Sequence, residues 1–169
     1  IRDSLKRATA LVRDGSGADL RGVEAVGISY QMHGLVVVDR DGKVLRPSII
    51  WCDSRAVEVG EKAFTAIGPD RSLAHLLNSP GNFTASKLRW VKENEPEIYE
   101  RIYKFMLPGD YIAYRLSGDI CTTISGLSEG MFWDFPNHEV ASFLLDAMGI
   151  DTSIVPEIKP TFSVQGELN

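Results

Sequence analysis

The first residues of the chain place apolar side chains on one face of a helix. These residues repeat at i, i+4, i+7 and i+11, in the order Ile1, Leu5, Ala8, Val12. This spacing is typical of an amphipathic helix. Gly15-Ser16-Gly17 then interrupts the pattern, and clustered Gly and Ser residues favour a loop. We predict a helix that ends near Gly15.

Two apolar segments further along read as strands that end in polar residues. Residues 23–30 are partly continuous and partly alternating in hydrophobicity, and they lead into Gln31-Met32-His33-Gly34. Residues 48–51 form a short apolar segment that stops at Cys52-Asp53-Ser54-Arg55. Because α/β sheets bind their ligands at strand ends, both polar segments are candidate site residues.

The rest of the chain mixes a hairpin with helices. Residues 35–38 and 44–45 flank a segment with an Asp-Gly pair, which favours a hairpin turn. A short strand is expected at 104–107. Apolar stripes with Gly or Pro boundaries predict helices at 56–67, at 85–93, after Pro96, at 108–118 and at 139–148. This mixture predicts an α/β domain with a mixed β-sheet flanked by helices.

Composition narrows the class of protein. The 169 residues are 44% hydrophobic and 24% charged, as in a soluble globular domain. The net charge of -5, without a Lys/Arg cluster, argues against nucleic acid as a partner. No apolar run is long enough to span a membrane, and no signal peptide opens the sequence. Cys52 and Cys121 stand alone and the three histidines lack metal-ligand spacing. We therefore expect a cytoplasmic protein without a metal site in this chain.

One motif suggests hydrolase chemistry. Residues 126–130 match the G-x-S-x-G elbow of α/β-hydrolases, whose serine needs a sharp strand-to-helix turn. The residues after Gly130 look strand-like, and Asp134 and His138 follow too closely to complete a triad from separate loops. We favour a polar turn between two sheet segments. Neither a GxxxxGK[ST] nor a GxGxxG phosphate-binding motif occurs in the chain.

Single residues at the strand ends have both a functional and a structural interpretation. A neutral His33 offers one hydrogen-bond donor and one acceptor, as a sugar hydroxyl requires. Taken alone, such a histidine is more often structural, and Trp51 is more often part of a core. Asp53 and Arg55 are spaced to form a surface ion pair of small energy. Lys87, on an amphipathic segment, is expected to be solvated.

Several of these segments occur together, and in this order, in one known family. The chain from about Val23 onward resembles the xylulokinase branch of the FGGY family of carbohydrate kinases. The blocks that carry the resemblance are Gln31-Met32-His33-Gly34, the segment 45–55, the segment 83–91, Glu95-Pro96-Glu97-Ile98 and the segment 107–111. The first block in particular separates xylulokinase-like members from glycerol-kinase-like ones.

The resemblance implies a fold, a reaction and a set of site residues. It implies an actin-like, ribonuclease-H-like fold, and transfer of the ATP γ-phosphoryl group, with Mg²⁺, to D-xylulose to give xylulose 5-phosphate. Met32 and His33 would contact the sugar, Trp51 would line the apolar side of its pocket, and Asp53 would hold its loop or reach a hydroxyl. Asn82 stands where relatives commonly have a small or aromatic residue that faces the sugar in some of them.

The resemblance also implies that residues 1–169 are part of an N-terminal, sugar-binding domain truncated at both ends. The first phosphate-binding strands, the catalytic aspartate block and the C-terminal ATP domain are not found in this sequence, so we assign no catalytic residue here, Asp134 included. We expect the fragment alone to be inactive, to bind no ATP or Mg²⁺, and to self-associate into a homo-oligomer through an open sheet edge.

Two alternatives stay open. The parent protein could be another FGGY kinase, acting on ribulose, gluconate, rhamnulose or a sugar alcohol. Alternatively, the chain could be a non-catalytic sugar-binding module that reuses this half of the fold.

Overall fold

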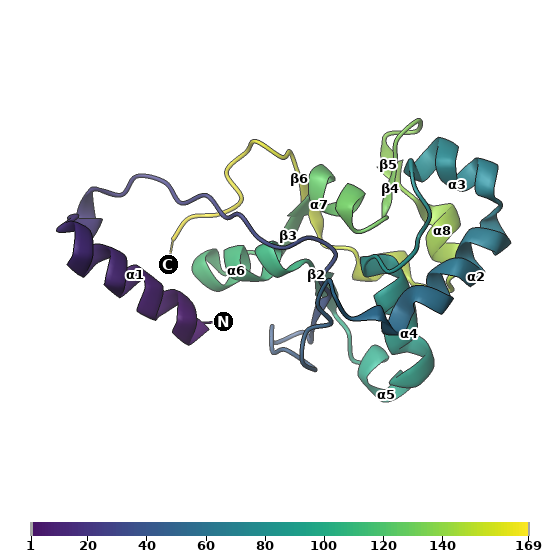
Figure 1. Ribbon diagram of the computed structural model, residues 1–169, viewed down its shortest axis with the longest axis horizontal. Coiled ribbons are helices and arrows are strands. Elements are labelled where there is room, and N and C mark those ends of the chain that lie inside the picture. The colour runs from purple at the N-terminus through teal and green to yellow at the C-terminus, as the bar shows by residue number, and fades with distance from the viewer. Residues whose placement is uncertain (1, 169) are drawn as a thin grey trace.

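The computed structural model describes residues 2–168, which form short strand pairs surrounded by helices (Figure 1). Two pairs are antiparallel and one is parallel. The antiparallel pairs are β1 (Val36–Val38) with β2 (Lys104–Met106) and β4 (Trp133–Asp134) with β5 (Glu139–Val140). The parallel pair is β3 (Cys121–Thr123) with β6 (Glu157–Lys159). The predicted mixed α/β class is confirmed.

Most helices carry the boundary signals that the sequence predicts, whereas the helices at Pro69–Leu76 and Ile124–Glu129 were not predicted. They are α1 (Arg2–Ser16), α2 (Val57–Ile67), α3 (Pro69–Leu76), α4 (Thr84–Asn94), α5 (Pro96–Tyr99), α6 (Pro108–Ser117), α7 (Ile124–Glu129) and α8 (Ser142–Ala147). Short 3₁₀ turns occur at Leu20–Gly22, Ser54–Ala56 and Thr152–Ile154. Proline occupies the first turn of α3, α5 and α6, where its missing N–H is no loss. Gly118 ends α6 in the left-handed conformation, with φ 88°. Among residues 2–168, no helix has both the length and the apolar character to cross a membrane.

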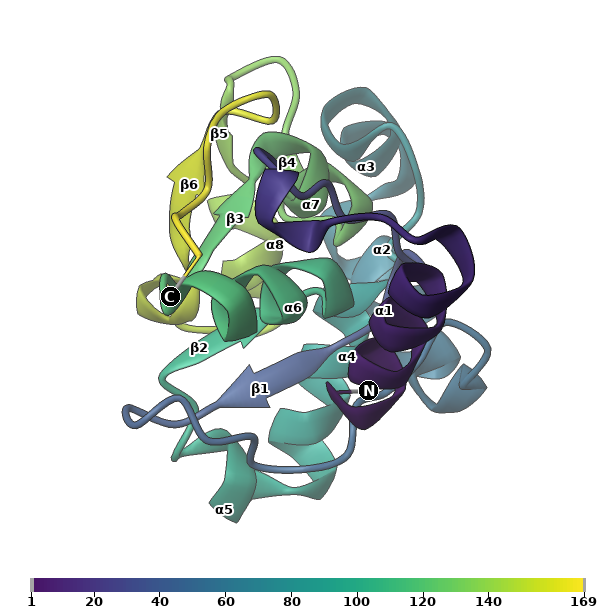
Figure 2. The same ribbon diagram turned by 90° about the vertical axis from the view of Figure 1, so that its left-hand side faces the viewer.

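The β1 strand is buried on both faces. Val36 and Val38 pack with Met106 against tyrosines of α6, and Figure 2 shows α6 running along this side of the strand. Val37 points the other way into the main core, as the alternation of side chains along a strand requires. This burial fixes the position of the chain segment that immediately precedes β1.

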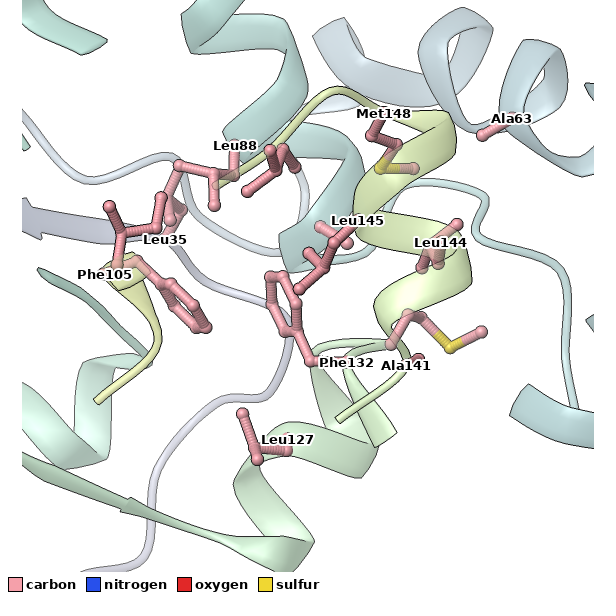
Figure 3. Packing of buried hydrophobic residues seen from close by; sticks show 14 of the residues in the cluster. Leu35, Ala63, Leu88, Phe105, Leu127, Phe132, Ala141, Leu144, Leu145 and Met148 are labelled. Atoms are coloured by element: carbon pink, nitrogen blue, oxygen red, sulfur yellow. The ribbon is translucent and has the colours of Figure 1, made fainter. Parts of the chain in front are cut away.

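The main hydrophobic core joins α4 and α8 to β1 and β2 (Figure 3). The rings of Phe105 and Phe132 stack at its centre, with centroids 4.3 Å apart. Leu88 of α4 and Leu145 of α8 are fully buried beside them. Each such side chain stabilises the fold by about 1.5–3 kcal/mol. The core therefore holds α4, whose first residues enter the candidate site, firmly in place.

The predicted hairpin after β1 forms, although its pairing is shorter than expected. The Asp39 carboxylate accepts hydrogen bonds from the backbone N–H groups of Asp41 and Lys43, and Gly42 adopts φ 72°. The returning segment of the hairpin pairs with β1 through one antiparallel bridge, between Val44 and Val38. The predicted strand at 48–51 is likewise reduced to a single bridge, between Ile49 and Leu35.

The predicted strand at 23–30 is wrong. Among residues 2–168 this segment has no pairing partner, and it crosses the molecule as extended chain (Figure 1). Val23 and Val26 are half-exposed. Tyr30 packs so closely on Gly109 that a Cβ there would collide with its ring. An alternating pattern forms a strand only where a neighbouring strand satisfies its backbone, and that neighbour is missing here.

Other boundaries also need correction. The predicted helix at 139–148 begins only at Ser142, because residues 139–140 pair with β4 instead. The predicted polar turn at 126–130 is wrong, since these residues belong mainly to α7. The Thr123 hydroxyl caps this helix by accepting from the N–H of Gly126. The helix predicted at the start of the chain is confirmed as α1, although Ile1 lies outside the described residues.

Candidate functional site

Residues at the start of α4 contact both polar segments that the sequence analysis singled out. Asn82 reaches the loop that contains Trp51 and Asp53, while Phe83 and Lys87 reach His33. The two polar segments are thereby brought to one place, although they lie about twenty residues apart in the chain. Met32 is beside His33 in sequence and half its surface is exposed.

Asn82 ties the 51–53 loop to α4. Its Nδ2 donates to the backbone carbonyl of Asp53 at 2.7 Å and approaches that of Trp51 at 3.4 Å. Its Oδ1 is buried and accepts no hydrogen bond within residues 2–168. A buried acceptor without a donor is unfavourable by about 1–3 kcal/mol, so this oxygen is a point where a donor group of a ligand would be favoured.

Asp53 closes its own loop. Its carboxylate accepts from the Arg55 guanidinium at 2.7 and 2.9 Å, and this hydrogen bonding holds the pKa of Asp53 below its ordinary value. The guanidinium also lies over the ring of Trp90, 4.7 Å from its centroid. Both carboxylate oxygens are therefore engaged with Arg55, which favours the loop-holding role over a free hydroxyl contact.

Trp51 does not belong to the core. The core interpretation of this residue is wrong, because 60% of its surface is exposed. Its backbone is held by Asn82 while its ring remains accessible. A large exposed aromatic face beside polar groups is a surface on which a ligand can pack.

His33 is held in one orientation and one tautomer. Its Nδ1 lies 3.0 Å from the backbone carbonyl of Glu129, and its ring meets Phe83 edge-on with centroids 4.3 Å apart. A carbonyl oxygen can only accept a hydrogen bond, so the geometry assigns the proton to Nδ1. In the neutral ring, Nε2 is then left as an acceptor for a hydroxyl group.

Lys87 is fully buried, so the expectation that it is solvated is wrong. Its Nζ donates to the backbone carbonyl of His33 at 2.6 Å. Burial lowers the pKa of Lys87 to about 8, and the negative charge of Asp53 opposes this shift. The sequence contained a signal for its burial, because Lys87 stands four residues before the buried Val91 on the same helical face. Nothing in the sequence indicated the contact of Glu129 with His33.

Among residues 2–168, no group of three or more His, Cys, Asp or Glu side chains could hold a metal ion. Cys52 and Cys121 are free thiols. Two surface hollows are not lined by any of the site residues Met32, His33, Trp51, Asp53 and Asn82. One, of about 600 Å³, lies between α1 and α6, and the other, of about 730 Å³, lies between residues 24–30 and 161–168.

Known proteins similar to this chain are sugar kinases. A family model of the N-terminal domain of the FGGY family of carbohydrate kinases matches residues 1–169. The chain is 38% identical to the xylulose kinase of Staphylococcus xylosus over 148 residues, which cover 86% of this chain and 31% of that protein. It is 32% identical to the xylulose kinase of Escherichia coli K12, over 91% of this chain and 32% of that protein. The chain thus spans about a third of the length of these curated relatives.

The fold agrees with these similarities. The crystal structure of a "xyloylose kinase" from Brucella ovis superposes with a TM-score of 0.85 at 28% identity, over 98% of this chain and 34% of that one. A gluconate kinase from Lactobacillus acidophilus superposes with a TM-score of 0.81 at 22% identity. These neighbours have the actin-like fold that the resemblance implied. The chain belongs to the FGGY family of carbohydrate kinases.

Proposed function

We propose that this chain is part of the sugar-binding, N-terminal domain of a xylulokinase. In this proposal the complete protein transfers the γ-phosphoryl group of ATP, with Mg²⁺, to a hydroxyl of D-xylulose, giving xylulose 5-phosphate. The similarity to several xylulose kinases supports the choice of sugar. The observation that carries the proposal is the convergence of His33, Trp51 and Asn82 through the first residues of α4.

Each site residue has a proposed task that its contacts support. The Nε2 of His33 accepts from a sugar hydroxyl, because Nδ1 is engaged by Glu129. The ring of Trp51 packs against the apolar side of the sugar, and the exposed side chain of Met32 lies along its open chain. Asp53 holds the loop through Arg55. The unpartnered Oδ1 of Asn82 accepts from a second hydroxyl.

The described residues, 2–168, offer no ready-made site for Mg²⁺ or for the phosphates of ATP. No metal-holding group exists among residues 2–168, and the sequence has no glycine-rich phosphate loop. Phosphoryl transfer depends on a positioned base and on bound phosphates. We therefore propose that other parts of a longer protein bind ATP and Mg²⁺. The two free thiols support a reducing, cytoplasmic location for that protein.

The test measures ATP-dependent phosphorylation by the complete protein that contains this chain. D-xylulose is compared with ribulose, gluconate, rhamnulose and glycerol, and the 169-residue chain is assayed in parallel. We expect the largest kcat/KM for D-xylulose with the complete protein. A clear preference for another sugar would overturn the choice of substrate, and absence of turnover on every sugar would overturn the kinase assignment.

A matched pair of variants tests the site. His33 and His138 both have left-handed backbones, with φ 62° and 53°, and Asn tolerates this conformation well. We expect His33→Asn to raise the KM for D-xylulose roughly 3- to 10-fold, the equivalent of one neutral hydrogen bond. His138→Asn should leave it unchanged. Equal effects of the two variants would remove His33 from the proposed site.

A further inference from the structure

Lys87 has an unusual environment for a charged side chain. It is fully buried on α4, and none of the ion pairs among residues 2–168 includes it. Its Nζ instead donates to the backbone carbonyl of His33, 54 positions earlier in the chain. Burying an ammonium group without a carboxylate partner is unfavourable. An apolar side chain of similar length would fill the same space at lower cost, so packing alone does not account for a lysine here.

The carbonyl that Lys87 binds belongs to a residue with a constrained backbone. His33 adopts φ 62°, a conformation that residues other than glycine rarely take. The next residue, Gly34, is pressed against Pro108 so closely that a Cβ would collide with the proline ring. The His33 backbone therefore turns sharply between the exposed segment before it and the buried β1 strand after it.

The contacts of His33 leave its Nε2 atom available to accept a hydrogen bond from a ligand. The Glu129 carbonyl engages Nδ1 and Phe83 packs against the ring. Lys87 holds the backbone carbonyl of the same residue. Together these contacts determine the direction in which Nε2 points, and the contact with Lys87 acts on the peptide group that follows the His33 side chain.

We propose that Lys87 is a positioning residue of the sugar site, which holds the backbone of His33 so that its imidazole faces the sugar. This inference rests on the proposed function. It assigns Lys87 no contact with the sugar or with the reacting atoms. Its action is transmitted through His33, so removing Lys87 should disturb the imidazole and the affinity for sugar together.

The experiment compares two lysines of the same helix in the complete protein. Lys87→Met removes the hydrogen bond to His33, while Lys92→Met removes a similar one from Lys92 to the carbonyl of Gly149, at the other end of α4. The readouts are the NMR signals of the His33 imidazole and the KM values for D-xylulose and ATP. We expect Lys87→Met to shift the His33 signals and to raise the sugar KM about 10-fold, the lower end for a hydrogen bond to a charged group. The KM for ATP should stay constant, and Lys92→Met should change neither readout.

A double variant separates positioning from general loss of stability. If Lys87 acts through His33, adding Lys87→Met to His33→Asn should raise the sugar KM no further. Additive effects would overturn the inference. If Lys87→Met fails to fold, as judged by circular dichroism, Lys87→Leu replaces it, since leucine is also apolar and likewise removes the donor. The inference would also be overturned if the folded variant has the same His33 signal and the same sugar KM as the wild type.

Failure of the inference can be distinguished from failure of the proposed function. A wild-type protein that phosphorylates D-xylulose, combined with an inert Lys87→Met substitution, would overturn only the inference. A wild-type protein that phosphorylates no sugar would overturn the proposed function, and the positioning role would fall with it.

Discussion

The side-chain amide of Asn82 donates to the backbone carbonyl of Asp53 across 2.7 Å, so the start of α4 holds a loop that precedes it by 29 residues. The same amide approaches the carbonyl of Trp51. Position 82 therefore determines where the loop lies, in addition to any contact its Oδ1 makes with a ligand. A small side chain at this position would leave the loop without this hydrogen bond.

We expect Asn82→Ala to raise the KM for sugar several-fold and to destabilise the protein by about 1 kcal/mol, the net value of one hydrogen bond. Asn94→Ala is the matched control, because its Nδ2 also donates to a backbone carbonyl, that of Trp90, but at the far end of α4. Its sugar KM should match that of the wild type. Steady-state kinetics and thermal unfolding measure both effects, and an unchanged KM in Asn82→Ala would remove the loop from the site.

Close packing of α2 supports the segment that carries Asn82. A Cβ at Gly60 would collide with the backbone carbonyl of Gly81, next to Asn82. We expect Gly60→Ala to destabilise the protein by about 1–3 kcal/mol, because backbone must move to admit the methyl group. Gly15→Ala has open space around it in α1 and should be neutral or slightly stabilising. Chemical denaturation measures the two changes. Equal stabilities of the two variants would show that Gly60 of α2 is not in tight contact with Gly81.

Local chemistry made the helix ends predictable. Gly118 ends α6 with φ 88°, and a proline opens α5 and α6, so the residues themselves carry the boundary. The segment 23–30 shows the opposite case. Its alternation is real, but a strand depends on a partner that its own sequence does not specify. The start of α8 is displaced for a related reason, since residues 139–140 pair with β4.

The candidate site was predictable in part. The polar residues after the two apolar segments, with the family resemblance, pointed to Met32, His33, Trp51 and Asp53, but no local pattern showed that Asn82 binds the loop. The error at Lys87 has a physical cause. A charged residue on an amphipathic helix is expected in solvent, and this expectation overrode the signal that Lys87 shares a helical face with the buried Val91.

Burial of Lys87 predicts a stability that rises with pH. Burial lowers its pKa to about 8 in the folded chain, whereas the ordinary value is near 10.5. The unfolded chain therefore binds the proton more tightly, and stability increases as pH rises from about 8 towards 10. We expect the wild type to gain up to roughly 3 kcal/mol relative to Lys87→Met over this interval. Urea unfolding at several pH values measures the gain. A difference between the two proteins that does not vary with pH would contradict the buried ammonium.

A hydrogen-bonded pair outside the candidate site, His75 with Asp134, predicts how the stability of the protein changes in acid. The Asp134 carboxylate is buried and lies 3.0 Å from the Nδ1 of His75, and it accepts two further hydrogen bonds from Asn137. Burial alone would raise the pKa of Asp134, but the hydrogen bonds from His75 and Asn137 outweigh it and hold the pKa below its ordinary value. The pair joins α3 to the β4–β5 hairpin, so its loss should loosen that contact.

The sign of this effect follows from the lowered pKa. A carboxylate with a lowered pKa in the folded state contributes stability above its ordinary value of about 4, and the contribution is lost as pH falls through the folded pKa. We expect the wild type to lose about 2 kcal/mol relative to Asp134→Asn between pH 5 and strongly acidic pH, in line with hydrogen bonds to a charged group. Asp146→Asn, which changes an exposed carboxylate of α8, should follow the wild type throughout. Denaturant unfolding across this pH range decides the point, because parallel curves for wild type and Asp134→Asn would mean that the pair adds no acid-sensitive stability.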